Sequence, residues 1–152
     1  HNHVVVDNYE VIKEANHLVL RNVRFWQPDP DGTGECQWVK NTYQIHRPLT
    51  AYLSKETPEQ RLTIFCMVTP LEEEACISWM WIAMNYAHDR SDHELRSFQD
   101  RVVAQDLTIL ELQRPRCLPL NLQSEFHLPC DRGSIAYRQW LRELGVTYGA
   151  IV

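Results

Sequence analysis

The sequence has no long apolar run and no cluster of basic residues. Its longest apolar segment, at residues 75–84, spans ten residues and includes a serine, which is too short for a membrane helix. The 15 Lys and Arg residues are outnumbered by 20 Asp and Glu residues, which gives a net charge of −5. Because a nucleic-acid surface needs concentrated positive charge, these features indicate a soluble protein that binds neither membrane nor nucleic acid.

Paired cysteines of the C-x-x-C type are also absent. The five cysteines are an odd number, and Cys66 and Cys76 fall in apolar strand-like runs, where thiols act as small hydrophobic groups. The sequence does not open with a signal-peptide pattern, so we expect a reduced, cytoplasmic protein. His1 and His3 could share a metal ion from one strand, but a chain terminus holds ligands poorly, and we expect no structured site there.

From residue 9 to residue 85 the apolar residues follow the period of two that is typical of β-strands. The strand-like runs lie at residues 9–14, 18–26, 37–46, 49–54, 61–68 and 75–85. The connections between them are short, which favours antiparallel neighbours. The last run is apolar on both faces, so we expect a central strand that is covered on each side.

One face of this last run carries Trp79, Trp81 and Asn85. Large aromatic side chains are common in ordinary protein cores, so core packing is one interpretation of this face. The alternative is that the three side chains form a wall of a substrate pocket.

After residue 85 the period changes to that of a helix. Ser91 and Glu94 have the spacing of a capping box, and the predicted helix ends near Gln113, before a proline. Asp131 and Gly145 have the positions of the start and stop of a last helix. We therefore expect one α+β domain over residues 1–152, in which a curved antiparallel sheet grips a long C-terminal helix, as in helix-grip or START-like folds.

The long helix contains one acidic residue within its apolar stripe. The stripe is formed by Leu95, Phe98, Val102 and Ile109. Asp106 lies inside it, and Gln99 and Gln113 sit seven residues to either side. A buried carboxylate must be hydrogen-bonded, ion-paired or bound to a metal ion. This pattern alone leaves open a structural carboxylate, a metal ligand and a catalytic group.

Several segments resemble a known family of oxygenases. FQDRVVAQDLTILELQRPRCLPL at 98–120 and LQSEFHLPCDRGSIAYRQWLRELG at 122–145 resemble the end of the catalytic domain of Rieske non-haem iron oxygenases. The nearest groups are the vanillate O-demethylase and phenylpropionate dioxygenase-like large subunits. NYAHD at 85–89, FWQPDPDGTG at 25–34 and HRPLTAYL at 46–53 add to the resemblance, which covers most of the chain.

The resemblance implies a role for Asp106. In that family two histidines and one carboxylate hold the catalytic iron, and the carboxylate lies in a Q/E-D-x-x-I/V-x-E setting that residues 105–111 match. Asp106 is then the carboxylate ligand of the iron. The resemblance further implies dioxygen, an aromatic small-molecule substrate, a [2Fe–2S] cluster, a reductase or ferredoxin as electron donor, and a parent protein that forms a homo-oligomer.

The chain departs from the family by what it lacks. No cysteine is followed by histidine at the C-x-H or C-x-x-H spacing of a Rieske cluster, and the D-x-x-H-x-x-x-x-H segment of the two iron histidines is missing. His88 and His93 have the mutual spacing but lack the preceding aspartate, so we interpret them as solvent-facing. We expect a C-terminal catalytic portion that is inactive alone, from a parent enzyme that hydroxylates or O-demethylates an aromatic compound.

Two other functions fit the chain as it stands. A non-enzymatic helix-grip domain would bind a hydrophobic small molecule without a metal ion. A structural or assembly role is the third possibility, because such a domain would expose apolar surface on which it could associate.

Overall fold

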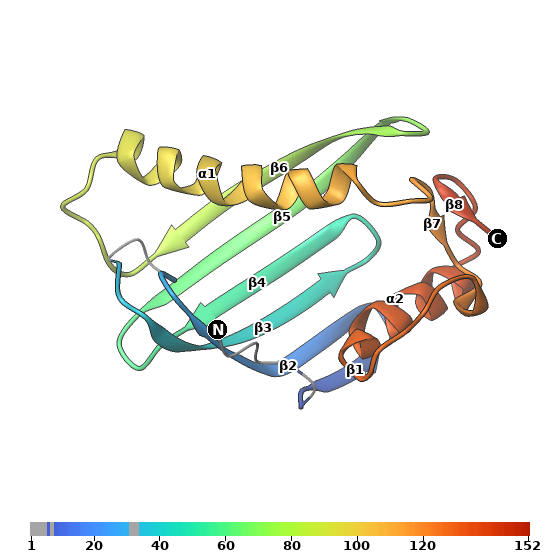
Figure 1. The fold of residues 1–152 in the computed structure, drawn as a ribbon, viewed down its shortest axis with the longest axis horizontal. Helices are drawn as coiled ribbons and strands as arrows, with labels where there is room; N and C mark the ends of the chain where they lie inside the picture. The colour runs from blue at the N-terminus through green and yellow to red at the C-terminus, as the bar shows by residue number, and fades with distance from the viewer. Residues whose placement is uncertain (1–5, 7, 31–33) are drawn as a thin grey trace.

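The computed structural model describes residues 6, 8–30 and 34–152. The expectation for His1 and His3 lies outside the described residues. Six strands form one antiparallel sheet in chain order (Figure 1). The strands are β1 (Glu10–Glu14), β2 (His17–Gln27), β3 (Gln37–His46), β4 (Thr50–Glu56), β5 (Arg61–Glu72) and β6 (Ala75–Met84). The six predicted strands and their antiparallel pairing are confirmed.

The prediction that the last strand is central is wrong. Among the described strands, β6 pairs only with β5, so it forms one edge of the sheet, and most of its side chains are exposed. Strands joined by short hairpins follow one another across a sheet, so the last one has a single neighbour. The apolar residues on its two faces therefore mark surfaces that the described part of the chain leaves largely uncovered.

Two helices complete the α+β architecture. α1 (Asp92–Glu111) begins after Ser91, whose hydroxyl accepts a hydrogen bond from the Glu94 amide at 3.3 Å, and the Glu94 carboxylate accepts one from the Ser91 amide at 2.9 Å. The predicted capping box is confirmed. The hydrogen bonds from Ser91 hold the pKa of the Glu94 carboxyl below its ordinary value.

The second helix, α2 (Arg132–Glu143), ends as predicted. Gly145 has a φ of 71° and its amide donates to the Arg142 carbonyl at 3.0 Å. Asp131 precedes the helix, but its carboxylate accepts from the Leu128 amide at 2.7 Å and not from α2 itself. The remaining elements are short: β7 (Leu118–Pro119), β8 (Ala150–Ile151), η1 (Leu122–Ser124) and η2 (Pro129–Asp131).

Both helices lie on one face of the sheet. Residues directly opposite one another on neighbouring strands point to the same side, and one such row consists of Leu20, Tyr43, Leu53, Ile64 and Ile82. α2 approaches this row at Leu20, and α1 shares a pocket with Ile82. The two helices thus cover opposite ends of the same face (Figure 1), which agrees with the predicted helix-grip fold.

Most of the core residues lie in β2, in α2 and in the segments beside them. The buried apolar side chains are Tyr9, Leu18, Val19, Val23, Val39, Leu62, Leu120, Trp140 and Leu141. Tyr9 connects the sheet to the helix, because its hydroxyl donates to the Cys130 carbonyl at 2.7 Å and accepts from the Gly133 amide at 2.9 Å. The Arg132 guanidinium lies 4.7 Å from the centre of the Tyr9 ring. Tyr9 therefore fixes the beginning of α2 against the sheet.

Two further features bear on the sequence analysis: disulfide bonds and membrane-spanning helices. No disulfide joins the five cysteines, all of which lie in the described residues. Among those residues, neither helix combines the length and the apolar character that a membrane-spanning helix requires.

We predict that Tyr9→Phe lowers the free energy of unfolding by about 2 kcal/mol, because the partly buried Cys130 carbonyl and the buried Gly133 amide both lose their partner. The measurement is urea denaturation followed by far-UV circular dichroism. Tyr148→Phe is the matched control, since Tyr148 is 62% exposed. Equal stability of the two variants would contradict this role of Tyr9.

Candidate functional site

A pocket of about 550 Å³ lies between β6 and α1. Its size falls in the range typical of small-molecule sites. The strand contributes Ser78, Met80, Trp81, Ile82 and Met84, and the helix contributes Asp92, Leu95, Arg96, Gln99, Asp100 and Val103. The strand wall is mostly apolar and the helix wall is mixed. This composition suits a flat ring with a few polar substituents.

The strand wall follows from the alternation of side chains along β6. Met80, Ile82 and Met84 share the face that α1 covers, whereas Trp79 and Asn85 belong to the opposite set. Sequence reasoning missed the methionines and Ile82. Period two separates the two faces of a strand, but both faces of β6 are apolar, so the pattern gives no sign of which one meets the helix.

The two tryptophans of the predicted pocket wall, Trp79 and Trp81, have different surroundings in the structure. Trp81 contributes to the lining of the pocket and also packs against Phe65, with 5.9 Å between the ring centres. Trp79 lines neither of the two pockets described here, and its indole N–H donates to the Thr69 hydroxyl at 3.1 Å. Both tryptophans are about half exposed.

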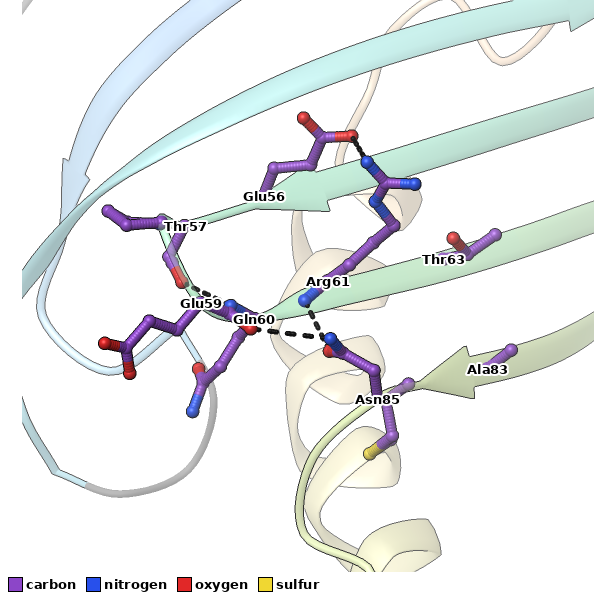
Figure 2. A pocket seen from close by; sticks show the side chains of 10 residues that line it. Glu56, Thr57, Glu59, Gln60, Arg61, Thr63, Ala83 and Asn85 are labelled. Atoms are coloured by element: carbon purple, nitrogen blue, oxygen red, sulfur yellow. Dashed lines mark hydrogen bonds and ion pairs between the residues drawn. The ribbon is translucent and has the colours of Figure 1, made fainter.

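Asn85 lies in a second pocket, of about 470 Å³, at the turn between β4 and β5 (Figure 2). Its side-chain oxygen accepts from the Arg61 amide at 2.7 Å, and its side-chain nitrogen donates to the Glu59 carbonyl at 3.4 Å. Beside it, the Arg61 guanidinium pairs with the Glu56 carboxylate at 3.1 Å. Asn85 thus ties the end of β6 to this turn, and its amide is occupied by the backbone.

One polar pair in the sheet, Asn41 and Tyr43, is shielded from water. Asn41 is the one buried polar side chain in the described part of the chain, and its amide donates to the Tyr43 hydroxyl at 3.1 Å. Burial raises the pKa of Tyr43 above its ordinary value. The tyrosine is therefore neutral at physiological pH, and this pair acts through hydrogen bonding only.

Asp106 lies on the side of α1 that lines the pocket. Gln99 and Val103 line the pocket, and Asp106 follows them by seven and three residues, which is the spacing of one helix face. The carboxylate is exposed, and it forms no hydrogen bond or ion pair with any described residue. Its direction matches the prediction, whereas the expected burial is wrong.

The reason is that α1 has no buried residue at all. The helix meets β6 through its N-terminal half, and farther along Ile109 is 62% and Leu110 is 63% exposed. Apolar residues on several sides are typical of a helix that is enclosed by other parts of a larger protein. In this chain, the described residues place no layer over that half of α1, so water reaches Asp106.

The described residues contain no group of three or more His, Cys, Asp or Glu side chains that could hold a metal ion. His88 and His93 are exposed, in agreement with their interpretation as solvent-facing. Asp106 could supply one oxygen ligand, but a ferrous oxygenase centre needs two imidazoles as well. The residues present therefore do not fit a complete iron centre.

Comparisons with known proteins agree with the sequence resemblance. Residues 2–147 match the sequence model of the family described as vanillate O-demethylase oxygenase C-terminal domain. A probable methylxanthine N7-demethylase of Pseudomonas sp. (strain TJI-51) is 35% identical over 154 residues, which cover 96% of this chain and 53% of that protein.

Two further relatives come from Pseudomonas putida. A methylxanthine N3-demethylase is 27% identical over 109 residues, covering 70% of this chain and 29% of that protein. A methylxanthine N1-demethylase is 30% identical over 92 residues, covering 60% of this chain and 25% of that protein. The chain spans about half the length of the first relative, and shorter parts of the other two are matched.

We predict that Asn85→Ala speeds hydrogen exchange at the Arg61 amide by about fivefold, because the substitution removes the acceptor of that amide and about 1 kcal/mol of local stability. Exchange is followed by mass spectrometry with peptide-level resolution. Asn85→Asp retains an acceptor and should keep most of the protection. His88→Ala, an exposed change three residues away, is the control. Unchanged exchange in Asn85→Ala would contradict the proposed tie.

Proposed function

The chain belongs to the family of vanillate O-demethylase oxygenase C-terminal domains, and we propose that it is the C-terminal catalytic portion of a Rieske-type iron oxygenase. The proposed reaction is the dioxygen-dependent removal of a methyl group from an aromatic compound. The observation that carries the proposal is the position of Asp106, which lies in the family's carboxylate motif and on the pocket side of α1.

The pocket supports an aromatic substrate. Met80, Ile82 and Met84 form an apolar wall on one side, and polarizable thioethers pack favourably against ring systems. The polar groups on the opposite helix wall would orient the ring. The names of the relatives describe demethylation of methylxanthines, which favours demethylation over ring hydroxylation for this chain.

The chain's own part in the reaction is limited. Asp106 would hold the iron as its carboxylate ligand, and the walls of β6 and α1 would bind the substrate and exclude water around it. The two histidine ligands and the [2Fe–2S] cluster would come from parts of the intact protein outside this chain. Iron supplies the activation of dioxygen when it is bound. The chain alone should not turn over.

We also propose the setting in which the protein works. A reductase or ferredoxin would deliver electrons to the parent enzyme, in the cytoplasm, where free thiols persist. The exposed apolar residues in the second half of α1 are Leu107, Ile109, Leu110 and Leu112. Contacts within the intact protein or its homo-oligomer would cover them.

A second candidate is a ligand-binding domain without enzymatic activity. The observation in its favour is that the described residues enclose a pocket but assemble no metal-binding group. Such a domain would bind a hydrophobic aromatic molecule with the same affinity whether or not iron is present.

We predict that Asp106→Ala in the intact protein abolishes mononuclear iron while leaving any [2Fe–2S] cluster in place, because one of three protein ligands is removed. Iron per protein is measured by plasma mass spectrometry, and the cluster by its visible absorbance. Asp100→Ala is the matched control, since it removes another exposed carboxylate of α1 that lines the same pocket. Full iron content in Asp106→Ala would overturn the assignment and favour the binding domain.

A further inference from the structure

Gln99 is the most shielded polar side chain on the helix wall of the pocket between β6 and α1. It is half-buried, whereas Asp92, Arg96 and Asp100 are exposed. Its amide forms no hydrogen bond with any described residue. The amide is therefore an unpaired donor and acceptor in a partly dry site, where a matched ligand group gains the most.

The surroundings of Gln99 orient it toward a ring in the pocket. Leu95 and Val103 lie one turn before and after it on the same helix face, and Met80 and Ile82 form the opposite wall. Apolar neighbours on both sides leave the amide as the polar group that a bound ring would meet at this depth. A ring that offers no partner would leave the amide unsatisfied.

The distance between Gln99 and Asp106 leaves room for a bicyclic ligand. Seven residues of α-helix rise by about 10 Å along one face. This length accommodates a fused bicyclic ring that is hydrogen-bonded at one end and carries a methyl group toward Asp106 at the other.

We propose that Gln99 is the residue that selects the substrate class, by reading the adjacent C=O and N–H of a lactam on a methylated bicyclic heteroaromatic compound. This inference rests on the proposed function. A primary amide presents one acceptor and one donor side by side, which is complementary to a lactam edge. A phenolic ring offers no such pair, and a site built to hydrogen-bond one group rejects ligands that lack it.

The test compares two probes that differ at this edge. 3,7-Dimethylxanthine has an N–H between two carbonyls in its six-membered ring, and caffeine differs from it only in a methyl group in place of that N–H. Binding is measured by calorimetry on the intact, metal-free protein, so that neither iron nor turnover affects the result. We expect 3,7-dimethylxanthine to bind about tenfold more tightly than caffeine, which corresponds to about one hydrogen bond.

Gln99→Leu should abolish this preference, chiefly by weakening the binding of 3,7-dimethylxanthine. Gln99→Met, which is closer in shape to glutamine, is measured in parallel so that a folding defect in one variant does not decide the outcome. Gln113→Leu is the matched control, since Gln113 lies seven residues beyond Asp106 and outside the pocket lining. Gln113→Leu should keep the wild-type preference.

Persistence of the preference in folded Gln99→Leu or Gln99→Met overturns the proposal, and so does a wild-type protein that binds both probes equally or binds neither. These results are separate from the iron measurement on Asp106→Ala. Iron that stays in Asp106→Ala, together with a preference lost in Gln99→Leu, would remove the oxygenase assignment of Asp106 and leave Gln99 as the selecting residue of a binding domain.

Discussion

The antiparallel pairing of β5 with β6 is the constraint on which the candidate site depends. Because the strands follow one another in chain order, this pairing puts β6 at the edge of the sheet. Asn85 ties the end of β6 to the neighbouring turn, and the capping box at Ser91 starts α1 six residues later. The helix is thereby held beside β6, and the pocket is the space between them. A shift of this register would turn the methionine wall away from the helix.

The structure distributes its packing unevenly. The buried residues gather around β2 and α2, where Tyr9 joins the two through the Cys130 carbonyl and the Gly133 amide. By contrast, α1 has no buried residue, although it carries the carboxylate of the family motif. The candidate site thus lies at the least packed end of the sheet. This agrees with the proposal that the chain is a portion of a larger enzyme, whose other parts would complete both the packing and the ligand set.

Much of the fold was predictable from local patterns. Strand positions, the capping box at Ser91 and the stop at Gly145 depend on neighbouring residues, and all three were confirmed. The predictions that failed concern burial. A central place for β6 and a buried Asp106 both required something to cover an apolar surface, and amphipathic spacing shows only which surface is apolar. The proposed role of Asp106 rests on the motif around it, because the described residues beside it do not complete a metal site.

The sequence by itself determined the order and type of the elements, the side of α1 on which Asp106 lies, and the family to which the chain belongs, because periodicity, capping and motif spacing are local properties of the chain. Only the tertiary structure decided which face of β6 meets α1 and that Gln99, rather than Trp79, lines the resulting pocket. It also decided that the Asn85 side chain hydrogen-bonds to the backbone of Glu59 and Arg61. These facts depend on which distant segments pack together. That packing is determined by interactions across the whole chain rather than within any one segment.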